Sequence, residues 1–234
     1  MASPLFCPNC GRASEGGLCA QCFLERFALV ECPLLEIKVC PTCDSCFWRG
    51  KWMECDSLDL ATSLVKSQVT INPVAEDVHI TFKPELLDKG AVKVHIDVNA
   101  VVKCENVSKE YDIIVKAKKE SCDRCSRIAG GYYAAIVQIR AEGRFPTAEE
   151  RSKSKKVAQN MIQQAQKSDR MAFISNIKEL REGIDIYVGS AKVGKQISKR
   201  IVSEFGGALS ESAKLVGHKD GKNQYRISYA VRLK

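Results

Sequence analysis

The sequence lacks the signals of membrane and exported proteins. No apolar run among its 234 residues approaches the ~18 residues that a membrane-spanning helix needs. The first residues, MASPLFCPNC, have no basic stretch followed by an apolar one, so we expect no secretory signal. Hydrophobic residues make up 45% and charged residues 27%, which excludes wholesale disorder. We therefore expect a soluble, intracellular protein that is located in the cytoplasm.

Catalytic motifs are also missing. The sequence contains no GxSxG, no HExxH and no phosphate loop. The segment from Gly189 to Lys195 resembles a phosphate loop, but its glycine spacing is wrong and the start of a helix explains it. The three histidines, at 79, 95 and 218, stand on predicted strand or turn positions without acidic partners, and we assign them no ligand role. We expect no enzyme.

Cysteine, in contrast, is abundant and unevenly placed. Nine of the twelve cysteines fall in the first 55 residues. Eight cysteines form four Cys-x-x-Cys pairs, at Cys7 and Cys10, Cys19 and Cys22, Cys40 and Cys43, and Cys122 and Cys125. One such pair is also typical of redox sites, but four pairs indicate metal, because two pairs complete a tetrahedral zinc site. Disulfides are the alternative, and the reducing cytosol argues against them.

Energetics favours zinc as well. A cysteine-rich segment of about 55 residues cannot bury enough apolar surface to fold unaided. Structural zinc supplies roughly 10–16 kcal/mol of apparent binding energy, which is enough to organise such a segment. We therefore expect two Zn²⁺ ions, each bound by four cysteine thiolates.

The pairing of the cysteines is clear for one site and open for the other. Cys7, Cys10, Cys19 and Cys22 lie close enough in sequence to make one compact site. A local second site from cysteines 40, 43, 46 and 55 is allowed by spacing, but it would leave the pair at 122 and 125 outside any metal site. We place that last pair at a polar hairpin tip between two strands. We favour Cys40, Cys43, Cys122 and Cys125, since eight paired cysteines make two complete sites. The other four, at 32, 46, 55 and 104, are then predicted to be small buried hydrophobes.

Charge is as uneven as cysteine. Residues 1–60 carry 5 Lys and Arg against 8 Asp and Glu, whereas residues 61–234 carry 31 against 20. Any single basic cluster is more often a solvated face than a binding site. Together, the clusters favour contact with RNA phosphate, through backbone and shape because no aromatic RNP signature or GXXG clamp is present. The candidate residues are Lys116, Lys118, Lys119, Arg124, Arg127, Arg151, Lys153, Lys155, Lys156, Lys192, Lys195 and Lys199.

The hydrophobic pattern predicts an α+β fold. A helix is expected at 56–67, followed by strands at 78–82, 92–102 and 111–118. From residue 132 the pattern predicts strand, helix, two strands, helix and two strands, with a capping box at Thr147 and Glu150 and a final turn at Asp220 and Gly221. The first six of these elements match a ferredoxin-like unit with two helices on one face of an antiparallel sheet. We expect a zinc-knuckle module at 1–56, a β-rich domain at 57–131 and the ferredoxin-like domain at 132–234.

The cysteine motifs and two strand motifs together resemble one family. The motifs are CPNCG-x7-CAQC at 7–22, CPTC at 40–43 with Trp52-x-x-Cys55, SCDRCSR at 121–127 leading to YAAIVQIR at 133–140, and EGIDIY at 182–187. They resemble the family of nonsense-mediated decay protein 3, the export adaptor of the large ribosomal subunit, and most of all its short archaeal branch. The resemblance implies that the eight paired cysteines are the zinc ligands.

The resemblance also implies a function. It implies an adaptor that binds the large ribosomal subunit, its RNA and its proteins, late in maturation or to control subunit joining. Eukaryotic members add C-terminal domains with transport signals, and because this sequence ends at Lys234 we expect no recruitment of an exportin. Two other hypotheses are a thiol redox protein that uses the pair at 122 and 125, where nearby cations lower the thiol pKa, and a zinc-ribbon module for free messenger or transfer RNA. We expect a monomer.

Overall fold

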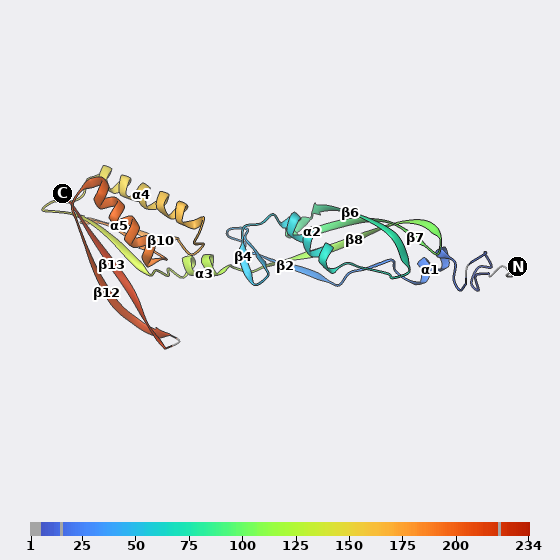
Figure 1. Ribbon diagram of the computed structural model, residues 1–234. Helices are drawn as coiled ribbons and strands as arrows, with labels where there is room; N and C mark the ends of the chain where they lie inside the picture. The colour runs from blue at the N-terminus through green and yellow to red at the C-terminus, as the bar shows by residue number, and fades with distance from the viewer. Residues whose placement is uncertain (1–5, 15, 220) are drawn as a thin grey trace. The chain divides into compact units, whose positions relative to one another are not determined.

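The structure is a computed structural model that describes residues 6–14, 16–219 and 221–234. It is an α+β protein in which sheets dominate, as the pattern predicts. The chain divides into two compact units, Met1–Cys122 and Asp123–Lys234, labelled by element in Figure 1. No helix in the described part of the chain is long and apolar enough to cross a membrane.

The first unit is built on a six-stranded sheet. Neighbouring strands are antiparallel except for one parallel pair, β2 with β8. In sheet order, the strands are β4 (Lys51–Met53), β3 (Cys46–Trp48), β2 (Leu35–Val39), β8 (Glu105–Lys119), β7 (Val92–Val102) and β6 (Ala75–Leu86). Smaller elements are α1 (Ala20–Arg26), the pair β1 (Val30–Glu31) and β5 (Thr70–Ile71), and the 3-10 turn η1 (Asp88–Gly90).

The alternating pattern of β7 determines which face of this sheet is covered. Its even-numbered residues from Val92 to Val102 are buried, and helix α2 (Ser57–Gln68) contacts β6 and β7. Asp56 caps that helix by accepting a hydrogen bond from the backbone N–H of Leu58 at 2.8 Å. The same core holds Leu29 and Ile37 from the cysteine-rich part of the sequence, so residues on both sides of position 56 pack together.

The second unit has the predicted order of elements from residue 132. A short helix, α3 (Asp123–Ala129), precedes it. The elements are β9 (Ala135–Ala141), α4 (Ala148–Gln166), β10 (Ile174–Leu180), β11 (Gly183–Val188), α5 (Ala191–Phe205), β12 (Ala208–Lys219) and β13 (Lys222–Leu233). The capping box at Thr147 and Glu150 is present. Asp220, half of the predicted final turn, lies outside the described residues.

The sheet of this unit has the order β10-β11-β9-β13-β12, which places β13, parallel, beside β9. In the ferredoxin-like arrangement the strand that follows the second helix takes the place beside the first strand and runs antiparallel to it. Here the last strand takes that place, because Tyr229, Val231 and Leu233 form a buried row, whereas β12 has no buried residue among 208–218. Gly194 lets α5 approach this sheet closely, since a Cβ there would lie 2.9 Å from the Cβ of Ala135.

Candidate metal centres and basic surface

The first four paired cysteines lie together at the start of the chain. Cys7 and Cys10 stand in a tight turn, Cys19 is the N-cap of α1, and Cys22 lies in the first turn of that helix. The Sγ atoms of the four cysteines lie within 4.8 Å of one another, and the Sγ atoms of Cys10 and Cys19 are 3.6 Å apart. The side chain of Asn9 donates to Cys22 Sγ at 3.2 Å. Among the described residues, Leu18 is the only other hydrophobic side chain packed against the buried cysteines of this group.

The second group unites pairs that are far apart in sequence. Cys40 and Cys43 lie in the turn between β2 and β3, Cys122 directly precedes α3, and Cys125 lies within that helix. Their four Sγ atoms also lie within 4.8 Å of one another, with 3.7 Å between those of Cys43 and Cys122. The backbone N–H of Cys122 donates to Cys40 Sγ at 3.4 Å. The parallel pairing of β2 with β8 brings these pairs together, because both strands end at the same edge of the sheet.

The two groups share one local design. Each takes two cysteines from a Cys-Pro-x-Cys turn and two from the start of a short helix. The residue after each turn has a positive φ, 73° at Gly11 and 53° at Asp44. Glycine adopts that conformation without steric cost, and aspartate is among the few other residues that tolerate it. The sequence around each Cys-Pro-x-Cys pair therefore specifies the turn that points both sulfurs to one centre.

The donor set and its spacing fit a zinc ion. Four sulfurs at about 2.3 Å in tetrahedral geometry are about 3.8 Å from one another. The distances of 3.6 Å and 3.7 Å between sulfurs from opposite pairs are close to this expected sulfur–sulfur distance. Bound there, the metal would cross-link the turn to the helix, and an all-cysteine shell would leave it no open position for catalysis.

The thiol pKa values show why each group favours a cation. The pKa of Cys7 is lowered to about 6, mainly because the backbone N–H of Cys19 donates to it. Burial raises the pKa of Cys40, but the backbone N–H groups of Cys122 and neighbouring residues outweigh it and bring the value to about 6. The amide of Asn9 lowers the pKa of Cys22, yet burial and the three neighbouring sulfurs raise it to about 12. A bound cation would stabilise the thiolate form of Cys22 and offset this increase in its pKa, so that all four cysteines could be thiolates.

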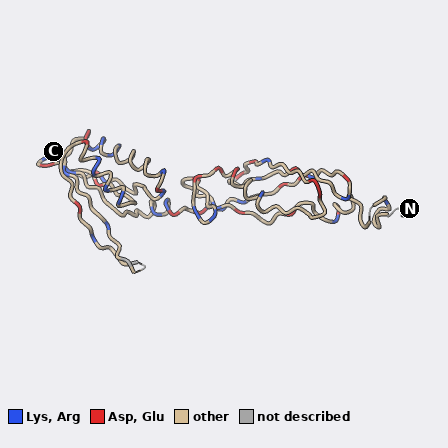
Figure 2. Tube along the Cα trace, viewed as in Figure 1, with Lys and Arg blue, Asp and Glu red and all other residues tan. Residues whose placement is uncertain are grey.

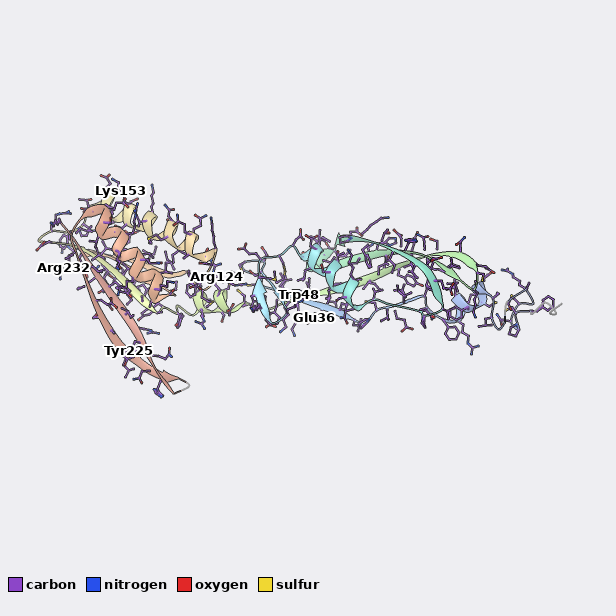
Figure 3. All side chains as sticks on the ribbon, in the orientation of Figure 1. Glu36, Trp48, Arg124, Lys153, Tyr225 and Arg232 are labelled. Carbon is purple, nitrogen blue, oxygen red and sulfur yellow. A yellow bond between two sulfur atoms is a disulfide. The ribbon has the colours of Figure 1, made fainter. Side chains whose placement is uncertain are left out.

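Four of the predicted basic residues of α4 and α5 line a groove between the two helices. One part, with a volume of about 600 Å³, is lined by Lys153, Lys156 and Arg200, and the next, of about 680 Å³, by Lys192, Lys199 and Arg200. Met161 and Gln164 border both parts, so they form one continuous groove. Figure 3 labels Lys153 on α4.

Two sequence models of one family match this chain. The model described as "NMD3, N-terminal domain" matches residues 7–130, and the model described as "NMD3, second domain" matches residues 132–233. The chain belongs to the NMD3 family. This confirms the family resemblance that the cysteine motifs indicated. A comparison with the curated proteins found no match.

The net positive charge of this NMD3-family chain lies in its second structural unit, whereas the first unit has a negative balance. Residues 123–234 carry 22 Lys and Arg against 11 Asp and Glu, a balance of +11, whereas residues 1–122 carry 14 against 17. Figure 2 shows the Lys and Arg positions along α4, α5 and the β12–β13 hairpin. A polyanion would therefore be attracted to the unit that contains the NMD3 second domain.

Several predicted RNA contacts have other partners in the fold. Arg151 donates to the backbone carbonyls of residues 146, 180 and 181, Lys155 pairs with Glu179, and Lys195 lies 2.9 Å from a carboxylate oxygen of Glu211. Around the second cysteine group, Lys118 faces Glu36 at 4.0 Å, and the guanidinium of Arg127 stacks on the ring of Tyr132. Lys116 and Lys119 are exposed, and Arg124 is half-buried.

Three of the four remaining cysteines differ from the prediction. Cys46 and Cys55 are joined by a disulfide, so the expectation of separate small hydrophobes is wrong for them, and neither belongs to the second tetracysteine group. The hairpin of β3 and β4 brings them together. Cys104 is exposed in the turn between β7 and β8, while Cys32 is half-buried against the core. The pair at 122 and 125 lies at a helix start, so a hairpin tip is also wrong there.

The prediction that the histidines have no acidic partners is wrong for His95. Its Nδ1 lies 2.7 Å from Asp112 and its Nε2 lies 2.9 Å from Asp97, with Glu110 at 3.9 Å. The register of β7 with β8 places Asp112 directly opposite, which the sequence alone does not reveal. Asp97 also accepts a hydrogen bond from Lys83 at 2.9 Å, so the ammonium group of Lys83 already balances part of the negative charge around His95.

We expect His95 to give the first unit a pH-dependent stability. The hydrogen bond to Asp112 is the main reason why its pKa is raised above 6.5, with Asp97 adding to the effect and burial opposing it. A group with a raised pKa stabilises the fold fully below its unfolded value, here about 6.5, and that contribution disappears as pH rises through the folded value. Urea unfolding between pH 5.5 and 8.5 should therefore show a decline that His95→Gln lacks. Parallel curves for the two proteins would contradict this assignment.

Proposed function

We propose that this NMD3-family chain is a zinc-stabilised, non-enzymatic factor that binds the large ribosomal subunit. It acts through ribosomal RNA and protein, in late subunit maturation or in the control of subunit joining. The observation that carries the proposal is that two NMD3 domain models together match residues 7–130 and 132–233, a range that includes both tetracysteine groups. The NMD3 family suggests a ribosome-related adaptor.

Each tetracysteine group holds one zinc ion in this proposal, and the zinc has a structural role. Residues 7–22 have almost no apolar core of their own, so the metal supplies most of their folding energy. Cys122 and Cys125, which a thiol redox function would use, lie with two further sulfurs, and this arrangement favours metal binding over thiol exchange. A monomer located in the cytoplasm stays a prediction.

RNA contact is proposed for the groove between α4 and α5, where Lys156 and Lys199 form no ion pair with another described residue. Charge reversal of both, Lys156→Glu with Lys199→Glu, should weaken binding to large subunits and reduce the slope of log affinity against log salt by about 2, one per lost phosphate contact. Sedimentation binding at several salt concentrations measures both quantities.

The matched control for the groove is Lys103→Glu with Lys109→Glu, which changes the net charge equally on exposed positions of the first unit. It should leave most of the affinity and the salt slope in place. An equal loss in both double variants would show a general attraction between charges and would contradict a contact in the groove.

The proposed function is tested in cell extract. The tagged protein, expressed at its natural level, should sediment in a sucrose gradient with free large subunits and their precursors, and not with joined ribosomes. A protein that stays at the top of the gradient, or that travels equally with small subunits, would contradict the proposal. Because the extract contains the natural competitors, a generic affinity for RNA cannot produce the selective peak.

A further inference from the structure

The hairpin of β12 and β13 extends beyond the sheet to which it belongs. β13 pairs with β9 only from Ile227, opposite Ala135, to Leu233. The pairing of β12 with β13 continues beyond that point, from Lys214 opposite Arg226 to Lys219 opposite Lys222. We call residues 214–226 the arm. Figure 1 shows its described residues, 214–219 and 221–226, projecting away from α4 and α5 as a two-stranded ribbon.

The arm places like charges opposite each other. Lys214 lies directly across from Arg226, and cross-strand pairs of equal charge are destabilising. Neither residue forms an ion pair with any carboxylate among the described residues. The sequence of the arm carries 4 Lys and Arg against 1 Asp. An anionic partner would relieve this repulsion.

The arm also exposes apolar side chains. Leu215, Val216 and Tyr225 are 54%, 45% and 52% exposed. An isolated two-stranded ribbon is marginally stable in water, and it gains nothing from apolar groups that face solvent. Such side chains become stabilising when the ribbon lies against another molecule. Figure 3 shows Tyr225 on the projecting part of the hairpin and Arg232 near its base.

One cation of the arm is already positioned. Arg226 Nη1 donates to the hydroxyl of Tyr133 at 3.3 Å, and its guanidinium lies 4.2 Å from the centre of that ring. The ring of Tyr133 packs edge-on against Tyr187 at 4.9 Å. This fixed cation on the sheet face opposite α5 loses little side-chain entropy when it contacts a ligand.

We propose that the arm docks on the phosphate backbone of folded ribosomal RNA, where Lys214 and Arg226 contact phosphates and the exposed apolar residues pack on the sugars and bases. Complementary charge identifies RNA as the occupant, because Lys214 and Arg226 form no ion pair with a described carboxylate and their unit carries a balance of +11. A-form RNA presents its phosphates and 2′-hydroxyls across a wide, shallow minor groove, where proteins bind through shape and backbone contacts. The inference rests on the proposed function, since it names a surface through which the large subunit is bound.

Two variants of the full-length, zinc-loaded chain test the arm. In the first, residues 214–226 are replaced by Asn-Gly, which closes a tight hairpin between Ala213 and Ile227 and keeps the whole pairing of β13 with β9. In the second, Lys214→Glu is combined with Arg226→Glu. The double variant of Lys103 and Lys109 described above serves as the charge-matched control for the second. Thermal unfolding shows whether each variant is folded.

The probes are purified large ribosomal subunits and their deproteinised RNA. Both arm variants should bind large subunits at least about tenfold more weakly, and the charge-reversed variant should lower the salt slope by about 2. A photoreactive side chain at position 225 should cross-link to RNA in the bound complex.

The outcomes distinguish a failure of the arm proposal from a failure of the proposed function. If wild type binds and the two folded arm variants bind as tightly as it does, the arm proposal is overturned and the proposed function stands. Cross-links from position 225 to ribosomal protein alone overturn RNA as the occupant, as does an equal loss in the control. If wild type fails to bind large subunits, the proposed function and the arm proposal both fail.

Discussion

Replacing Cys122 with alanine is expected to halve the zinc content, from two ions per chain to one. Cys122 contributes one of the four sulfurs of the second group, and its backbone N–H also contacts Cys40. Three remaining thiolates bind zinc far more weakly than four, since the apparent energy of a complete site is roughly 10–16 kcal/mol. The first group, formed by residues 7–22, should keep its metal.

The control for this substitution is Cys46→Ala. Cys46 is bonded to Cys55 and lies outside both groups, so the variant should retain both zinc ions. Metal analysis of the purified proteins after dialysis measures the content. Loss of zinc from Cys46→Ala with retention in Cys122→Ala would contradict the assignment, and would favour the local site that sequence spacing also allows.

Removing zinc with a chelator should unfold residues 7–22 while the central sheet stays folded. In the first group the buried cluster consists of Cys7, Cys19 and Cys22, and Leu18 is the one further hydrophobic residue that packs against it in the described part of the chain. The sheet core around Ile96 and Val98, in contrast, contains none of the eight paired cysteines. The expected change is therefore local and large at the start of the chain.

Hydrogen exchange resolves this prediction residue by residue. The backbone amides of Gly11 and Phe23 are hydrogen-bonded to the carbonyls of Cys7 and Cys19, and they should lose protection when the metal is removed. Amides of β7 should retain theirs. Full protection of Gly11 in the metal-free protein would show that the turn is stable without zinc, and the structural role of the first site would be wrong.

Local patterns in the sequence were sufficient to predict much of this fold. The alternation from Val92 to Val102 predicts β7 with its observed bounds, and the capping box at Thr147 and Glu150 marks the start of α4. Both signals depend on residues a few positions apart. The Cys-x-x-Cys pairs are equally local, and counting them was enough to predict which eight sulfurs would gather in two groups.

Features that depend on strand order and register could not be predicted from local sequence patterns. The place of β13 beside β9 follows from its buried row of apolar residues. The order of elements along the sequence does not say whether β12 or β13 pairs with β9. The partners of His95 come from the facing strand, and the hydrogen bonds of Arg151 reach carbonyls about thirty residues away. The disulfide of Cys46 and Cys55 depends on a hairpin of three-residue strands that the hydrophobic pattern did not indicate.

Co-sedimentation of the zinc-loaded protein with purified small and large ribosomal subunits, at physiological salt, tests the central claim most directly. We expect selective travel with the large subunit. Equal binding to the two subunits that disappears with a modest increase in salt would show a generic attraction to polyanions. That result, or no binding to either subunit, would contradict the account of this protein as a large-subunit factor.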